Sequence, residues 1–503
     1  MLTLTPKKNS NNALWVGIGG VLFGILAGVA VGAQPLYLGL GLGAISALIY
    51  FFTDFERAVL VLLIVRSALD NFSVQQIPAV YAVGLDALTL LYVVILLLTN
   101  KTVKTDRFWW FFAGWVALQG VWLVLMPLGG LGLDASFIGD SLREWTRLFS
   151  WLMVYLLVMQ LRGRVPPEKV ISILFFALLI PLTIAFLQTV APSILPALLS
   201  ARPPDFVIQE VKGISASMDQ GPRIRGTLGH ANGLATYLLL FMSLTWWKLS
   251  RAKKRWPWLL LMGLLAFFFV SAKALFSLMM LAVFVFVLIA FRASLVNLIG
   301  GVFLFSLVIV LFLSTEFGQG RISSIANTPI LNPDIEISRA ILLSKRDYNS
   351  FNWRISQWSY LLGAWQNYPY LGYGLGTSIR VSTNRLMPHN DYVRALVEGG
   401  AVGFIAFLFF FGRQIVHLVQ LRRWLPEWSA QRALCTVLLA LLLSIPVGMI
   451  TENIWSHTTF FVYWWTLFAI AGWNWNEKPP ESTAEFREQP IRRKLETSRD
   501  AYL

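Results

Sequence analysis

Long runs of apolar residues recur from one end of this sequence to the other. A helix needs roughly 20 mostly apolar residues to cross the hydrocarbon core of a bilayer, so each run is a candidate membrane span. The candidate spans lie near residues 14–32, 36–52, 57–69, 79–98, 108–128, 146–161, 169–190, 228–247, 256–270, 273–291, 295–313, 397–419, 433–450 and 457–473. The short run at 57–69 and the closely spaced pair before Lys273 are the weakest of these. The pattern therefore predicts about 12–14 transmembrane helices.

The composition agrees with this interpretation. Hydrophobic residues make up 56% of the chain and charged residues only 13%, whereas a soluble domain carries about 25% charged residues. The formal net charge of +15 falls between the apolar runs, as in the cytoplasmic loops of membrane proteins that face anionic lipid. We therefore predict an all-α polytopic membrane protein whose partners include membrane lipids and no nucleic acid.

The short loops predict the orientation. Four loops are rich in Lys and Arg, at 101–107, 162–169, 248–255 and 413–432. They fall on the same side of the membrane when the spans are counted alternately. The connections at 70–78 and 451–456 contain no Lys or Arg. Because cytoplasmic loops are enriched in Lys and Arg, both termini are predicted to be cytoplasmic. The apolar run after Lys8 is expected to stay as the first span, because another apolar run follows it at once.

This topology divides the chain into four parts. The parts are an N-terminal transmembrane bundle at 1–313, which includes an outer segment at 191–226, a large and mainly helical outer loop at 314–395, C-terminal transmembrane helices at 396–474 and a cytoplasmic tail at 475–503. The Pro203-Pro204 pair argues against an uninterrupted helix in the outer segment. The tail balances acidic against basic residues and has little apolar content, so we expect it to be disordered.

The large outer loop holds the densest set of polar residues. The segment from Asn352 to about Tyr368 has the pattern of an amphipathic helix that ends before Pro369, and Arg354 and Trp358 share one face of it because they are four residues apart. Near the end of the loop, Asn390 or Asp391 is a natural N-cap for the next helix.

A glycine-rich segment, Pro369-Tyr-Leu-Gly-Tyr-Gly-Leu-Gly376, follows the amphipathic helix. It does not match a phosphate-binding or dinucleotide-binding fingerprint, because no strand precedes it and no Lys-Ser follows. Alternating glycines permit tight turns and close approach of backbones. We therefore expect Gly372, Gly374 and Gly376 to be structural.

A second polar set closes the earlier outer segment, in the sequence Arg223-Ile-Arg225-Gly-Thr-Leu-Gly-His230-Ala-Asn232. Two arginines stand at the mouth of a predicted span, with His230 and Asn232 one turn inside it. His230 is close enough to Arg225 in the chain to line the same cavity.

These motifs follow one another in a recognisable order. Arg225-Gly226 with Asn232 comes first, followed by Arg354 with Trp358, then Pro369 with Gly372-Tyr373-Gly374, then His389-Asn390, and last Gly399-Gly400. Over roughly residues 220 to 420, and in its layout of many spans around one large outer loop, the chain resembles the bacterial O-antigen ligase and O-antigen polymerase superfamily.

The resemblance implies a glycosyltransferase in the bacterial inner (cytoplasmic) membrane, with its active site facing the periplasm. The donor would be a glycan on undecaprenyl diphosphate, and the acceptor a sugar hydroxyl on another lipid or glycan. Transfer in the ligases is inverting and needs neither a metal nor a cofactor. By the matching motifs, His389 would be the essential histidine, and Arg225 and Arg354 the essential arginines. The extra spans and the cytoplasmic tail depart from the ligase pattern.

The chemistry of these residue types is consistent with such a reaction. Arginine binds a diphosphate bidentately and stays charged, and histidine is the side chain whose unperturbed pKa lies near neutrality. We therefore expect His389 to deprotonate the acceptor hydroxyl while Arg225 and Arg354 hold the diphosphate. Further candidates for substrate binding are Asn390, Asn232, His230 and Arg223.

The remaining histidines and Glu452 are not expected to take part in catalysis. Glu452 and His457 lie at an outer helix mouth and are taken as interfacial, and His417 lies among cytoplasmic basic residues and is taken as non-catalytic. With one cysteine and four histidines, a disulfide is impossible within the chain and a His-rich metal site is not expected.

Three alternatives remain open at this stage. A metal-dependent polytopic glycosyltransferase would need an acidic residue in the first outer loop, which here is reduced to about Ala33-Gln34-Pro35. A transporter or flippase is a different class, for which Asp86, Arg66 and Lys273 are possible intramembrane charges. Within the favoured class, ligase and polymerase differ only in the acceptor. We take the ligase first and keep the polymerase as the alternative.

Overall fold

The computed structural model describes residues 35–201, 223–291, 328–344, 350–383 and 385–476, with isolated positions between 299 and 326. The predicted spans near 14–32 and 295–313, the Pro203-Pro204 pair and the tail from residue 477 onward lie outside these described residues. The chain divides into two compact units, residues 1–61 and 62–503. The first unit contains α2 (Pro35–Thr53) and the start of α3 (Phe55–Val65).

The described elements of the second unit are helices. In chain order its longer ones are α4 (Ile77–Leu98), α5 (Arg107–Leu125), α6 (Ile138–Met159), α7 (Pro167–Leu174), α8 (Leu179–Val190), α9 (Ala231–Leu249), α10 (Trp256–Ser271), α11 (Leu275–Ala290), α14 (Ile337–Ser344), α15 (Ser350–Trp365), α16 (Ser378–Val381), α17 (Asp391–Trp424), α18 (Ala430–Met449) and α19 (Thr458–Ala471). Within the second unit α11 and α17 pack on α18, α10 packs on α9, and α4, α5 and α19 pack on α6.

Several of these helices match a membrane in length and composition. Within the described residues, five helical segments are long and apolar enough to cross a bilayer: Ile77–Leu98, Arg107–Leu125, Pro167–Val190, Asp391–Trp424 and Ala430–Met449. The helices α10, α11 and α19 are shorter but equally apolar. The prediction of an all-α polytopic membrane protein is thereby confirmed, and the helix boundaries fall within a few residues of the predicted spans for α4, α5, α10, α11, α18 and α19.

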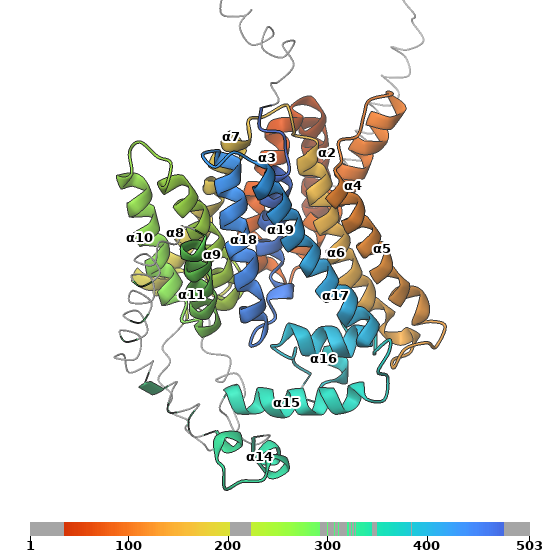
Figure 1. Cartoon of the computed structure of the whole chain (residues 1–503). Helices are drawn as coiled ribbons and strands as arrows, with labels where there is room; N and C mark the ends of the chain where they lie inside the picture. Colours follow the sequence, from red (N-terminus) through yellow and green to blue (C-terminus); the bar gives the residue numbers. More distant parts are fainter. Residues whose placement is uncertain are drawn as a thin grey trace, which may run out of the picture. The chain divides into compact units, whose positions relative to one another are not determined.

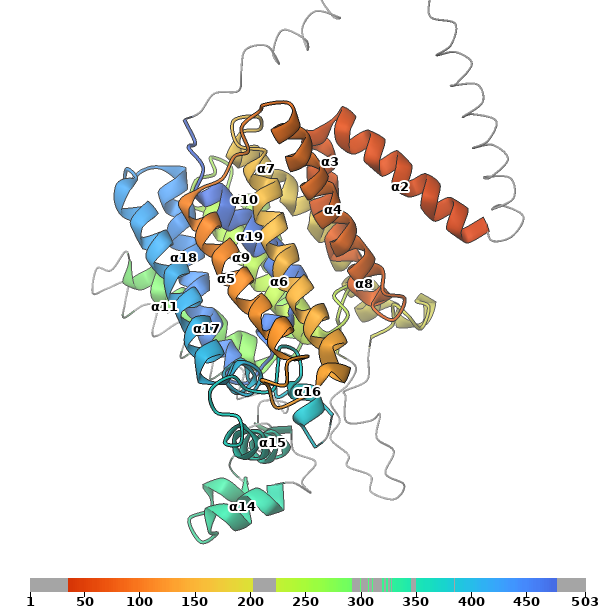
Figure 2. The ribbon, with the colours of Figure 1, turned by 90° about the vertical axis from the view of Figure 1, so that its right-hand side faces the viewer.

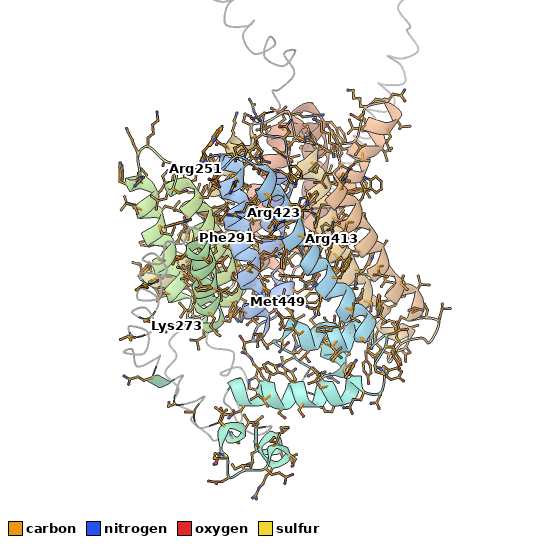
Figure 3. All side chains as sticks on the ribbon, viewed as in Figure 1. Arg251, Lys273, Phe291, Arg413, Arg423 and Met449 are labelled. Carbon is orange, nitrogen blue, oxygen red and sulfur yellow. The ribbon has the colours of Figure 1, made fainter. Side chains whose placement is uncertain are left out.

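The two ends of the second unit differ in character. Helices α14, α15 and α16 lie beyond one end of the helix bundle, as both ribbon views show (Figures 1 and 2). Lys273 and Met449 lie toward this end, whereas Arg251 and Arg423 lie toward the opposite one (Figure 3). We call these the loop end and the basic end. The separation agrees with the alternation of basic loops in the sequence.

The segment Pro167–Val190 is interrupted where a proline requires it. The short 3₁₀ helix η4 (Phe175–Leu178) separates α7 from α8. Pro181 has no N–H, so it cannot bond the carbonyl four residues earlier, that of Ala177. The hydroxyls of Ser67 and Tyr237 donate to this carbonyl instead, each at 2.8 Å. Two neighbouring elements thus satisfy a polar group that the hydrocarbon cannot, which is the general condition for a proline inside a membrane helix.

Helix α17 is kinked near its start, and the glycine-rich segment fits into the kink. Gly400 has φ of 61°, and a Cβ there would meet the Tyr370 carbonyl oxygen at 2.3 Å. Gly372 has φ of 69°, and a Cβ there would lie 2.5 Å from the Val397 carbonyl oxygen. The Tyr373 N–H donates to that carbonyl at 2.9 Å. The two backbones approach so closely that only glycine fits at these two positions, in agreement with the structural role expected for Gly372.

The three possible intramembrane charges have local explanations. Asp86 of α4 accepts a hydrogen bond from Ser150 of α6 at 2.5 Å, and Arg66 pairs with Asp70 at 2.6 Å. Lys273 lies in the turn between α10 and α11. Asp86 thus links α4 to α6, and Arg66 pairs with a carboxylate four residues later in the chain.

Candidate active site

Helix α15 lies across the segment that leads into α17. It ends at Trp365, before Pro369 as predicted, and Arg354 and Trp358 stand one turn apart on it. The indole N–H of Trp358 donates to the Pro388 carbonyl at 2.5 Å, and Arg354 donates to the Thr451 carbonyl at 3.1 Å. One face of the helix therefore reaches both the residue before His389 and the connection between α18 and α19.

His389 has a backbone conformation that non-glycine residues rarely adopt, with φ of 48°. Trp353 packs edge-on against the imidazole of His389, with the ring centroids 5.7 Å apart. The side chain of His389 remains 23% exposed. The next residue, Asn390, caps α17 by accepting the Tyr392 and Val393 N–H groups at 3.0 Å, which confirms the predicted cap. Strained backbone held between a fixed proline and a helix cap is typical of functional positions.

The buried carboxylate beside His389 belongs to Glu452, in the connection between α18 and α19. Its Oε1 lies 3.4 Å from Nδ1 of His389 and accepts the Asn453 N–H at 3.1 Å, while Oε2 accepts a hydrogen bond from the side-chain amide of Asn232. Only 6% of the Glu452 side chain is exposed. The residue taken as interfacial from its sequence position is therefore a buried centre joining three elements.

The charge on Glu452 is strongly favoured. Burial alone would raise the pKa of this carboxyl, but the rings of His389 and His457 and the guanidinium of Arg354 together hold the pKa well below its usual range. Glu452 is thus an anion at any pH near neutrality. It supplies a fixed negative charge next to a partly exposed imidazole.

His457 faces the same carboxylate from the other side. Its Nε2 lies 3.9 Å from Oε1 of Glu452, and its Nδ1 is 2.9 Å from the hydroxyl of Thr236. Burial lowers the pKa of His457 to about 4, against the opposing effect of the Glu452 and Asp70 carboxylates. His457 is therefore neutral at physiological pH, and it too was taken as interfacial from the sequence.

The start of α9 adds a second link to Glu452. Arg223 donates to the side-chain oxygen of Asn232 at 2.7 Å, and Asn232 in turn donates to Glu452. His230 is the N-cap of α9, and its Nδ1 accepts the Asn232 N–H at 3.1 Å. The sequence placed His230 one turn inside the helix. The helix begins later because Gly226 and Gly229 both have positive φ and end the preceding turn.

Arg225 lies in a different setting from the other arginines. Its three guanidinium nitrogens donate to the carbonyls of Ser200, Gly229 and Leu198 at 3.0, 3.2 and 2.9 Å. Gln188 accepts its backbone N–H at 2.9 Å. The side chain also lines a cavity of about 280 Å³ together with Asp70 and Ser200. Arg225 thus ties the 198–200 segment to the start of α9.

A second buried ionic group lies one turn inside α17. Arg394 is 2.9 Å from Glu144 of α6 and 3.0 Å from Glu398. Glu398 also accepts the Ser378 hydroxyl at 2.6 Å and the Gly376 N–H at 2.8 Å, and Arg147 pairs with Glu144. These contacts fasten α16 and the glycine-rich segment to α6 and α17.

The structure brings together some of the residues named from the sequence. His389 and Arg354 both act on Glu452, and Asn232 and Arg223 join the same group. We call this set, Arg223, Asn232, Arg354, His389, Glu452 and His457, the Glu452 cluster. Sequence reasoning missed Glu452 and His457 as members. One available signal was a carboxylate in a short outer connection that carries no Lys or Arg.

Metal binding was considered for the same side chains. Across the described residues, no group of three or more His, Cys, Asp or Glu side chains is arranged to hold a metal ion.

One comparison with known proteins gave a match. A family model described as O-antigen ligase matches residues 259–408, a region that includes α15, the glycine-rich segment, His389 and the kink of α17. No curated protein matches the chain.

Proposed function

We propose that this chain, whose residues 259–408 match the O-antigen ligase family model, is a glycosyltransferase that moves a glycan from undecaprenyl diphosphate to a sugar hydroxyl. The acceptor is carried by another lipid or glycan. The enzyme works in the bacterial inner membrane with its site on the periplasmic side. The observation that carries this proposal is the partly exposed imidazole of His389 next to Glu452, on which the charge of Arg354 also acts, at the end of the bundle opposite the basic loops.

His389 acts as the general base. The acceptor oxygen attacks the anomeric carbon, its proton passes to the imidazole, and the bond from that carbon to the diphosphate oxygen breaks with both electrons leaving on the diphosphate. A single displacement of this kind inverts the anomeric centre. General-base catalysis contributes about 10²–10⁴-fold to a rate, so His389 is expected to carry much of the chemical step.

The arginines stabilise the leaving diphosphate. Helix α15 carries Arg354, whose guanidinium binds the diphosphate of the donor. The charge of Arg354 also acts on Glu452. Arg225 hydrogen-bonds neutral carbonyls, which do not cancel its positive charge, so it still contributes an attractive potential to the cavity that it lines. Charge stabilisation at the leaving group lets the reaction proceed without a metal ion or a cofactor.

Reconstitution tests this proposal. The purified protein in proteoliposomes, supplied with a lipid-linked glycan and an acceptor and with no ion gradient, is expected to release undecaprenyl diphosphate and glycosylate the acceptor. Activity should persist in EDTA. A protein that moves the lipid across the bilayer without consuming it would be a flippase, and activity lost in EDTA and restored by a divalent cation would indicate the metal-dependent class.

The product separates the two assignments within the superfamily. A ligase attaches the glycan to a core lipid or another final acceptor. A polymerase extends a second lipid-linked repeat and makes longer lipid-linked chains. We take the ligase first, and the reconstituted product with both acceptors present decides between them.

A further inference from the structure

We propose that Glu452 is a positioning residue for His389: it holds the imidazole with its hydrogen on Nδ1, so that the lone pair of Nε2 faces the acceptor hydroxyl. This inference rests on the proposed function, because it assigns the orientation of the base in that reaction. It adds a residue of the α18–α19 connection to a site otherwise built from α15 and the segment before α17.

The geometry around His389 selects one tautomer. Nδ1 of His389 is buried and lies 3.4 Å from Oε1 of Glu452, a close contact that falls short of hydrogen-bond geometry in this structure. A carboxylate next to it can only accept a hydrogen bond. The hydrogen of a neutral imidazole is therefore favoured on Nδ1. The other ring nitrogen then carries the lone pair, as a general base requires.

Glu452 itself is poorly suited to be the base. Its side chain is 6% exposed, compared with 23% for His389. Oε2 already accepts from Asn232, and Oε1 accepts from Asn453. With both oxygens occupied inside the protein, this carboxylate is placed to orient a neighbour and not to meet a substrate.

The same carboxylate stabilises the product of proton transfer. When Nε2 takes the acceptor proton, the ring becomes a cation, and its Nδ1 side lies 3.4 Å from the negative charge of Glu452. The proton stays on the histidine and Glu452 remains ionised, in the way that a buried Asp supports a catalytic His without itself being protonated.

His457 does not compete with His389 for this role. Both histidines lie near the same oxygen of Glu452, but His457 is farther away at 3.9 Å and is only 11% exposed. Its Nδ1 is also engaged with Thr236. Of the two histidines, His389 alone combines the closer contact with access from outside.

Asn232 and Arg223 hold the carboxylate in place. Asn232 bridges Arg223, at 2.7 Å, and Oε2 of Glu452. The groups that act on Glu452 thus come from α15 (Arg354), from the segment before α17 (His389) and from the start of α19 (His457), with His230 and Asp70 acting in turn on His457. Of these, only His389 is proposed to exchange a proton with substrate.

The first test is Glu452→Gln in the reconstituted transfer assay. Gln keeps the shape and removes the negative charge. With its oxygen in place of Oε1 it can still accept from Nδ1, and its NH₂ group then faces the side-chain amide of Asn232. We expect kcat to fall about 10- to 100-fold, with KM for the lipid-linked donor nearly unchanged. We also expect the acid limb of the pH–rate profile to move to lower pH, because a neutral neighbour stabilises the protonated imidazole less than a carboxylate does.

Two further variants make the result decisive. Glu144→Gln is the matched control, a buried carboxylate at the same end that pairs with arginines; it should leave the acid limb in place. His389→Ala is the reference for the base itself. If His389→Ala is inactive but Glu452→Gln has the wild-type kcat, or an acid limb that matches Glu144→Gln, the positioning role is wrong and the proposed function stands. If His389→Ala keeps wild-type transfer, the base assignment fails whatever Glu452 does.

Asn232→Ala provides an independent test if Glu452→Gln does not fold. Asn232→Ala leaves the carboxylate charged but removes the donor to Oε2. A lower kcat with unchanged KM values supports the positioning role. A raised KM with unchanged kcat overturns it and indicates that Asn232 contacts substrate directly.

Discussion

Two buried ionic groups lie at the loop end of the second unit, and both are centred on a glutamate. Glu452 is surrounded by histidines, an amide and one arginine, whereas Glu398 is bonded by Arg394, a serine hydroxyl and backbone N–H groups. In the Glu452 cluster the side chain of His389 is 23% exposed, and Arg223, Arg354 and His457 are also partly exposed. In the second group the corresponding side chains, Arg394 and Glu398, are only 3% and 7% exposed.

The difference separates chemistry from architecture. An arginine cannot give up its proton at any relevant pH, so the group around Glu398 can hold segments together but cannot take a proton from a substrate. A histidine can, and a buried carboxylate next to it fixes which nitrogen does so. Similar burial of a glutamate therefore has different consequences, which depend on the partner and on its access to the outside.

The largest effect is expected at His389, the proposed general base of the Glu452 cluster. His389→Ala should reduce the rate of glycan transfer by about 10³-fold or more, within the range for loss of a general base, while donor binding is retained. His417→Gln, in α17 and toward the basic end, is the control and should keep wild-type transfer. Equal transfer rates for the two variants would show that His389 is not the general base.

The next largest effect is expected on stability, in the other group. In Glu398→Gln the side-chain NH₂ must face either Arg394 and Ser378 or the Gly376 N–H, so one donor always meets another donor. We expect a loss of about 3 kcal/mol in the free energy of unfolding, measured as a lower Tm in detergent. Glu427→Gln is the control, since that side chain is 87% exposed, and its Tm should stay close to wild type. A stable Glu398→Gln with impaired chemistry would contradict the architectural role.

A smaller change is expected for the arginine that the Glu452 cluster shares with α15. Arg354→Ala should raise KM for the lipid-linked donor by about 10- to 100-fold, in line with loss of charge-assisted hydrogen bonds worth about 1.5–3 kcal/mol. Arg354→Lys should recover only part of this, because lysine lacks the planar fork. Arg380→Ala removes an exposed arginine of the same loop that pairs with Asp140, and it should leave KM unchanged. A donor KM that does not respond at Arg354 would exclude it from diphosphate binding.

The smallest effect concerns pH and the neutral histidine. The pKa of His457 is about 4 in the folded protein, below the ordinary histidine value of 6.5. Between these two values the unfolded state binds more protons, so stability falls as the pH is lowered. From pH 7 to pH 5 this amounts to about 2 kcal/mol. In His457→Gln the Tm should therefore depend less on pH in this range. A wild-type pH dependence in the variant would show that His457 is not the group responsible.

Much of the architecture was predictable because its causes are local. Membrane spans follow from the hydropathy of about 20 consecutive residues. The orientation read from Lys and Arg in short loops stays a prediction. The cap at Asn390 and the end of α15 before Pro369 likewise depend on neighbouring residues. The predicted boundary of α9 was wrong by a few residues, because the positive φ of Gly226 and Gly229 was not apparent in the apolar pattern.

The sequence by itself determined that the chain is a multi-pass helical membrane protein, and it singled out His389, Arg354 and Asn232 through motifs at characteristic spacings. Only the tertiary structure decided which of them meet, and it brought Glu452 into their centre. Asn232 and Glu452 are 220 positions apart in the chain, so no local pattern links them. Their contact depends on α9, α18 and α19 packing side by side, which buries the carboxylate of Glu452 among partners that keep it charged.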